Sequence, residues 1–213
     1  MGDCSSGSCS SGSCSSGSCS NDKDRLPPGM LSVYNLDQQT ALGTLIWAET
    51  VGDGDISIHP TVFEILGKIT EMSDDRIFAV AVGSIALKPL YKELFEHGVD
   101  TLYHIRNREL WTFDPKGYAE VLADVSSRVN PRLIVIPGTS AGKDIASYLS
   151  EILGSDAVYE IDPSSADRMM SENTTDRYPK ILIVRPGTFT PKKPVHGRTG
   201  TMISRMFSPE GSR

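Results

Sequence analysis

The chain has 213 residues and a formal net charge of −6, from 21 Lys and Arg against 27 Asp and Glu. That length allows one well-buried core and is short for two full domains. The mild acidity argues against a general nucleic-acid binder, which needs a basic face. No apolar run approaches the ~20 residues of a membrane-spanning helix, and the N-terminus lacks the apolar segment of a signal peptide. We therefore expect a cytoplasmic protein without membrane insertion.

Residues 1–29 are expected to form a disordered Cys/Ser/Gly repeat tail and a linker, because they offer almost nothing apolar to bury. The only cysteines of the chain recur in a Cys-Ser-Ser-Gly-Ser unit, at Cys4, Cys9, Cys14 and Cys19. Four thiolates suggest a metal or an iron–sulfur cluster. Their even spacing disfavours this interpretation, since such sites prefer closely spaced cysteine pairs. The alternative is a flexible repeat with exposed, oxidisable thiols.

After the linker, apolar runs alternate with helical stripes. Residues 44–49 and 76–82 are expected to be strands, the second continuous enough to be covered on both faces. A helix beginning at Pro60 and another over residues 87–95 each show one apolar face. Gly98 is typical of a position just past a helix end.

The alternation continues beyond Gly98. Residues 101–105 and 132–136 are expected to be strands, and Asp114 is expected to cap a helix whose first residue is Pro115. The next helix is expected to turn Ile145, Tyr148, Leu149, Ile152 and Leu153 inward. Short strands follow at 157–161 and 180–185, separated by a loop. This order predicts an α/β fold, a doubly wound and mostly parallel sheet with helices on both faces. Residues 191–213 are interpreted as a basic extended tail.

One segment has the features of an anion site. The strand over 132–136 runs into a glycine-rich turn and then a helix, so backbone N–H groups and the helix dipole point outward from the sheet. The candidate cofactor-binding residues are Gly138, Thr139, Ser140, Gly142 and Lys143. Asp144 follows Lys143, so this is not a Walker A loop. The structural alternative is a tight turn with a capping hydroxyl at Thr139 or Ser140.

The other polar candidates show no catalytic pattern. His59, His97, His104 and His196 lie in four separate segments without metal-ligand spacing. His104 is interpreted as a satisfied core or rim residue, Trp47 as a core aromatic and Trp111 as a rim aromatic. Arg185 ends an apolar strand and is interpreted as a cofactor-binding, ion-pair or interface residue.

Four segments in this order resemble the electron transfer flavoprotein α subunit. The first is Leu-Ile-Trp-Ala-Glu-Thr with the helix that contains Glu-Ile-Leu-Gly-Lys; the second is Val-Asp-Thr-Leu-Tyr-His with Asp-Pro-Lys-Gly-Tyr-Ala. The third is Pro-Gly-Thr-Ser-Ala-Gly-Lys-Asp-Ile-Ala, and the fourth is Ile-Val-Arg-Pro-Gly-Thr-Phe. The resemblance extends over about residues 43–190. It assigns residues 30–190 to the N-terminal domain of that subunit, a Rossmann-like fold similar to the adenine nucleotide alpha hydrolases.

The resemblance implies a non-catalytic scaffold subunit that pairs with a β-type subunit in electron transfer. A dehydrogenase or iron–sulfur protein would be the redox partner. The family's α subunit continues into a FAD domain that this sequence lacks, so FAD on the assembled complex is expected to be held by partner chains. Two alternatives remain: a stand-alone regulatory module that binds AMP or another adenine nucleotide, and a metal or iron–sulfur carrier acting through the cysteine tail.

Overall fold

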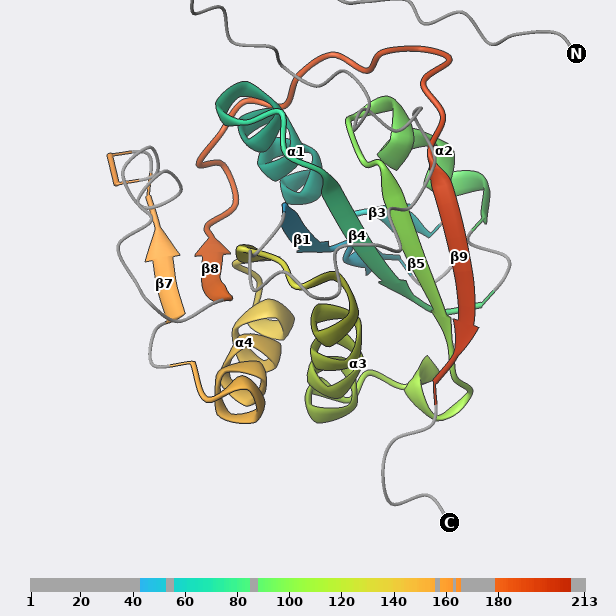
Figure 1. Cartoon of the computed structure of the whole chain (residues 1–213), viewed down its shortest axis with the longest axis vertical. Coiled ribbons are helices and arrows are strands. Elements are labelled where there is room, and N and C mark those ends of the chain that lie inside the picture. The colour runs from blue at the N-terminus through green and yellow to red at the C-terminus, as the bar shows by residue number, and fades with distance from the viewer. Residues whose placement is uncertain are drawn as a thin grey trace, which may run out of the picture. The chain divides into compact units, whose positions relative to one another are not determined.

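The computed structural model describes residues 43–52, 56–84, 88–155, 158–162, 164–165 and 179–207. Its centre is a seven-stranded sheet in the order β7-β8-β6-β1-β4-β5-β9, and every pair of neighbours is parallel (Figure 1). The strands are β1 (Thr44–Trp47), β4 (Ile77–Val82), β5 (Thr101–Arg106), β6 (Leu133–Pro137), β7 (Val158–Ile161), β8 (Lys180–Val184) and β9 (Thr201–Met206). The predicted α/β fold with a mostly parallel sheet is confirmed.

The central strands are apolar along their whole length because helices cover both faces. Every residue of β1, β4, β6 and β8 is buried. Strand residues that point to one side join one hydrophobic cluster and their neighbours along the strand join the other: Ile46 belongs to the first and Leu45 and Trp47 to the second. This alternation is the period of two that a strand imposes.

Helices α1 (Pro60–Met72) and α2 (Lys88–Glu96) cover the first face. The expected apolar stripe of α1 is buried at Val62, Ile65, Leu66 and Ile69. His59 is its N-cap, where the ring Nδ1 accepts a hydrogen bond from the backbone N–H of Thr61 at 3.2 Å.

Helices α3 (Pro115–Val129) and α4 (Ser140–Leu153) cover the second face and pack against each other. Asp114 caps α3 as predicted, accepting from the backbone N–H of Lys116 and Gly117. The expected burial of Tyr148 and Ile152 on α4 is wrong, because 43% and 45% of these residues is exposed. Ile145 and Leu149 of the same helix are fully buried, so the buried face of α4 is narrower than the predicted one and leaves Tyr148 and Ile152 outside it.

Three short elements were not predicted. β2 (Thr50–Val51) and β3 (Ser57–Ile58) form an antiparallel pair after β1. A 3-10 turn, η4 (Glu109–Trp111), follows β5 and leaves Trp111 64% exposed. None of the described helices has both the length and the apolar character needed to cross a membrane.

The C-terminal region corrects the prediction of an extended tail over residues 191–213. Residues 185–200, here called the crossing segment, run from β8 past α1 and α2, and β9 then pairs with β5 at the opposite edge (Figure 1). The proline, glycine and charged residues of this region are typical of a tail, but contacts with residues far away in the sequence hold the segment in place.

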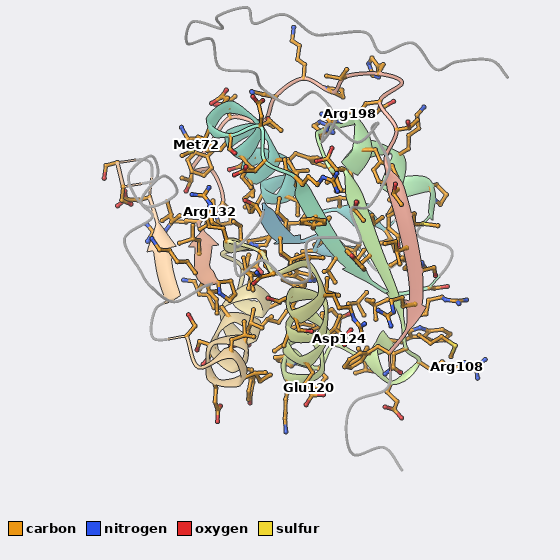
Figure 2. All side chains as sticks on the ribbon, viewed as in Figure 1. Met72, Arg108, Glu120, Asp124, Arg132 and Arg198 are labelled. Carbon is orange, nitrogen blue, oxygen red and sulfur yellow. The ribbon has the colours of Figure 1, made fainter. Side chains whose placement is uncertain are left out.

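Three acidic side chains hold the crossing segment. The carboxylate of Glu64 on α1 accepts from the backbone N–H of Gly187 at 2.9 Å, and the carboxylate of Glu96 on α2 accepts from Gly197 at 3.3 Å. Asp100 accepts from the Arg198 guanidinium at 2.8 Å; Arg198 is labelled in Figure 2. The backbone hydrogen bond from Gly197 and attraction to Lys92 and His196 lower the pKa of Glu96.

Several predictions lie outside the described residues. These are the four cysteines, the rest of the tail and linker over 1–29, and residues 208–213 of the C-terminal region. Most of the expected loop between β7 and β8 is also outside them. Trp47 is described and is buried as predicted. His104 is also buried, which is the core position of the two predicted for it, and its Nε2 lies 3.1 Å from the backbone oxygen of Gly83.

Candidate functional site

The glycine-rich turn lies where the sheet changes winding direction. From β1 the chain winds through β4 to β5 on one side and then returns to β6 and β8 on the other. The carboxyl ends of β1 and β6 are neighbours in register, Ile46 beside Val135. In open α/β sheets ligands bind at this switch point, outside the carboxyl ends of the strands. The candidate residues therefore occupy the expected place for a ligand.

Thr139 caps α4. Its hydroxyl oxygen accepts from the backbone N–H of Gly142 at 3.0 Å, and its carbonyl oxygen accepts from the N–H of Lys143 at 3.0 Å. A threonine in extended backbone conformation immediately before a helix satisfies N–H groups that have no partner within the helix. The alternative of a tight turn with a capping hydroxyl is thus realised at Thr139.

Two glycines of the turn are needed for close packing. A Cβ at Gly142 would lie 1.9 Å from the backbone oxygen of Pro137, and one at Gly138 would lie 2.8 Å from that of Val184. The N–H of Gly138 also donates to Val184 at 2.7 Å. The N–H groups of Gly138 and Gly142 therefore serve the protein itself. Anion binding by the predicted set stays a prediction.

Glu49 is the site residue that sequence reasoning missed. It lies two residues after the end of β1, and only 7% of it is exposed. The Thr139 hydroxyl lies 3.1 Å from each of its carboxylate oxygens. Burial raises the pKa of Glu49 and the hydrogen bond from Thr139 partly opposes that rise. A charged residue at the end of an apolar strand, Ala-Glu after Leu-Ile-Trp, is the sequence signal that would have found it.

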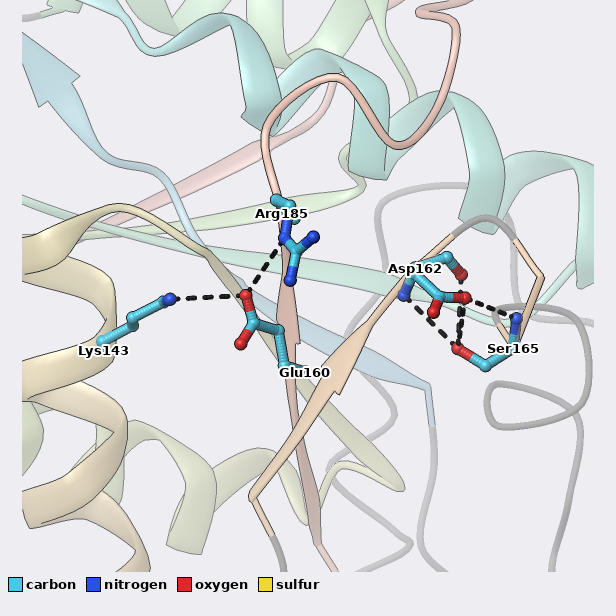
Figure 3. Close-up of polar contacts among 5 residues, drawn as sticks. All are labelled: Lys143, Glu160, Asp162, Ser165 and Arg185. Carbon is cyan, nitrogen blue, oxygen red and sulfur yellow. Dashed lines mark hydrogen bonds and ion pairs between the residues drawn. The ribbon is translucent and has the colours of Figure 1, made fainter.

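Lys143 and Arg185 converge on one exposed carboxylate instead of facing the turn together. The Lys143 Nζ and the Arg185 Nε each lie 3.3 Å from the same oxygen of Glu160 on β7 (Figure 3). Hydrogen bonds from Lys143 and then Arg185 lower the pKa of Glu160. Arg185 is thus an ion-pair partner, one of the roles predicted for it.

Beside this cluster the chain turns sharply at Asp162, whose carboxylate accepts from the hydroxyl and backbone N–H groups of Ser164 and Ser165. Figure 3 shows the contacts between Asp162 and Ser165. These hydrogen bonds, led by that of the Ser164 hydroxyl, lower the pKa of Asp162 to about 2. The turn is an ordinary Asx-type structure.

The described part of the chain holds no group of three or more His, Cys, Asp or Glu side chains placed to bind a metal ion. The metal candidates Cys4, Cys9, Cys14 and Cys19 lie outside that part. Thiolate ligation by the tail therefore stays a prediction.

Replacing Thr139 by Val tests the link between the cap and Glu49. The change removes the cap, which costs ~0.5–2 kcal/mol, and leaves the buried carboxylate without its donor, which costs a further ~1–3 kcal/mol. Denaturant unfolding should show the sum. Thr139→Ser keeps the hydroxyl and should lose about 1 kcal/mol or less, since only a methyl group goes. Equal losses in both variants would contradict this role of the hydroxyl.

Glu49 should give the protein a pH dependence that Glu49→Gln removes. A carboxyl whose pKa is raised on folding binds more protons in the folded state, so stability falls as pH rises above the ordinary value of 4.5 toward the raised one. His59 acts oppositely, because burial lowers its pKa and stability falls as pH drops below 6.5. The measurement is the free energy of unfolding of Glu49→Gln minus that of the wild type, because the His59 contribution is the same in both and cancels. This difference should grow as pH rises from 4.5 and then level off. A difference that does not change with pH would contradict the prediction.

Comparison of the sequence with known proteins identifies the family to which the chain is related. The electron transfer flavoprotein domain model matches residues 50–205. The α subunit of the electron transfer flavoprotein from Clostridium acetobutylicum is 30% identical over 173 residues, 72% of this chain and 50% of the relative. The corresponding subunit from Megasphaera elsdenii is 25% identical over 162 residues, 67% of this chain and 48% of the relative.

A third relative is named as a subunit of an enzyme. LctC, a subunit of the NAD⁺- and ferredoxin-dependent lactate dehydrogenase of Acetobacterium woodii, is 26% identical over 151 residues, 62% of this chain and 36% of the relative. The chain thus spans at most about half the length of these relatives. The family match extends to residue 205, inside β9. The chain belongs to the electron transfer flavoprotein family and is similar to its α-type members.

Proposed function

We propose that this chain is a non-catalytic scaffold subunit of an electron transfer flavoprotein-type complex in the cytoplasm, where it pairs with a β-type subunit. The observation that carries the proposal is the family match over residues 50–205. This range includes the five sheet strands from β4 to β8 and the helices between them. Relatives named as α subunits support a partner subunit, since a subunit by definition works in an assembly.

The geometry of the switch point supports a scaffold more than a catalyst. The polar groups of the turn already make hydrogen bonds within the protein, at Gly138, Thr139 and Gly142. The two nearby cations, Lys143 and Arg185, are paired with Glu160. A site whose donors already serve the fold has little left for a reacting group. We therefore place the flavin of the complex, as FAD, on partner chains, with a dehydrogenase or iron–sulfur protein as the redox partner.

Purification from the native host, without a tag on the tail, tests the proposal. We expect a β-type subunit to co-purify in stoichiometric amount and the complex to show a flavin spectrum, whereas the chain isolated from its partners is colourless. A monomeric chain without a partner would contradict the proposal, and so would stoichiometric flavin on the isolated chain.

The same purification of a chain lacking residues 1–25 is the matched control for the cysteine tail. If the folded domain carries the pairing, the shortened chain retains the same partner and spectrum. Loss of redox activity with the partner still bound would instead favour a metal or iron–sulfur role for Cys4, Cys9, Cys14 and Cys19.

A further inference from the structure

The buried carboxylate of Glu49 lies where a ligand anion would be expected. In doubly wound folds the N-terminus of the helix after a switch-point strand attracts anions through its free N–H groups and dipole. Here that helix is α4, and its capping hydroxyl, Thr139, donates to both carboxylate oxygens at 3.1 Å. A carboxylate and a phosphate offer the same acceptor oxygens to such donors.

From this arrangement we infer that Glu49 is the resident anion of the switch point and the residue that excludes phosphate-bearing ligands from it. The glycine turn alone does not exclude them, because it has the architecture that phosphate sites share. The inference concerns the isolated chain and goes beyond pairing with a β-type subunit.

The local charges support exclusion. Among the described residues no ion pair with Glu49 is found, and the lysine nearest in sequence to the turn, Lys143, is 3.3 Å from Glu160. An incoming phosphate would lie beside the negative charge of Glu49, a residue of which only 7% is exposed to water. Like charges that share a poorly solvated site disfavour each other strongly.

The neighbouring backbone keeps Glu49 in place. The N–H of His59, the residue that caps α1, donates to the carbonyl oxygen of Glu49 at 2.8 Å, and the N–H of Ala48 donates to Val80 at 2.8 Å. The backbone that carries the carboxylate is thus attached to β4 and to the start of α1. Replacement by a ligand would require this segment to move, so exclusion is built into the fold.

Chemical rescue of Glu49→Ala tests the inference on the full chain. Removing the side chain leaves a space lined by the Thr139 hydroxyl, which acetate or inorganic phosphate can fill. An anion that binds only the folded state at ten times its Kd raises the folding equilibrium constant about elevenfold. We expect acetate or phosphate to stabilise Glu49→Ala to this extent over chloride at equal ionic strength, and to leave the wild type unchanged relative to chloride.

The controls separate the site from general charge effects. Glu151→Gln removes one negative charge from the exposed side of α4 and should behave as the wild type. A folded Glu49→Ala protein that gains nothing over chloride would overturn the inference, as would a wild type that gains as much as the variant.

A second variant covers the case in which Glu49→Ala does not fold. Glu49→Gln keeps the volume and removes the charge, so inorganic phosphate, followed by ³¹P NMR, should bind at least tenfold more tightly than to the wild type. Equal binding to Glu49→Gln and the wild type would show that the charge of Glu49 is not what excludes phosphate. Because none of these measurements needs a partner, failure here leaves the proposed pairing untouched.

Discussion

A chain that ends after Thr190 should fail to form a stable domain. The deletion removes β9 and most of the crossing segment. β5 then loses its pairing with β9 over six residues, and Phe95 loses the backbone of Gly200 that covers it. It also breaks the 2.8 Å contact between Arg198 and Asp100. We expect a loss of about 5 kcal/mol or more, comparable to the whole stability of many domains, and aggregation through the newly exposed edge of β5.

The measurement is thermal unfolding followed by circular dichroism, together with the soluble yield. A chain lacking only residues 208–213 is the matched control, because it retains every described contact of β9. If the chain ending at Thr190 unfolds with the midpoint of the control, residues 191–207 are a dispensable tail and their description as part of the sheet is wrong.

Gly142→Ala should have the largest effect of any single methyl group in the switch point. Its Cβ would lie 1.9 Å from the backbone oxygen of Pro137 and 3.0 Å from Ile136, so α4 would have to move away from β6. Overpacking of this kind costs ~1–3 kcal/mol and more where backbone is the obstacle, and we expect the upper end, about 3 kcal/mol. For a domain of this size that is a fall of roughly 6–12 °C in Tm.

Ser147→Ala adds no atom and lies on the exposed side of the same helix, so its effect should stay within ~0.5 kcal/mol. If Gly142→Ala is as stable as Ser147→Ala, the glycine is there for a reason other than packing. Binding of a ligand close to its backbone would then be the alternative to examine.

The main elements of the fold could be predicted because their signals are local. The helical stripe of α1 and the capping pair of Asp114 and Pro115 depend on residues close in sequence. β9 could not be predicted in this way. Its burial alternates between intermediate and exposed, and its pairing partner β5 lies about a hundred residues earlier in the sequence. An edge strand with one half-covered face has a weak hydrophobic pattern.

The site likewise has one part with a local sequence signal and one part that depends on residues far apart in the sequence. The turn with Thr139 and Gly142 could be found from a strand, glycines and a helix in succession. The Ala-Glu after an apolar strand marks Glu49 as a charged residue in an unusual place, but its partner could not be found from the sequence. Thr139 is 90 positions away, and the two side chains meet only when β1 and β6 become neighbours. The sequence predicts that Lys143 faces a ligand. In the structure its Nζ lies 3.3 Å from a carboxylate oxygen of Glu160, which belongs to the next strand in the sequence, β7.

These contacts give one physical account of the domain. The sheet brings the carboxyl ends of β1 and β6 together, a buried carboxylate takes the place that a ligand anion would occupy, and the crossing segment ties the two halves of the sheet to each other. A domain with these properties suits a subunit that positions others. We propose that this chain works in a complex with a β-type subunit.

Native mass spectrometry of the complex purified from the host tests that claim most directly. The account predicts one assembly that contains this chain and a β-type subunit in equal numbers, with a flavin that leaves with the partner chains when the assembly is dissociated in the gas phase. A species made only of this chain, or flavin that stays with this chain after dissociation, would contradict it.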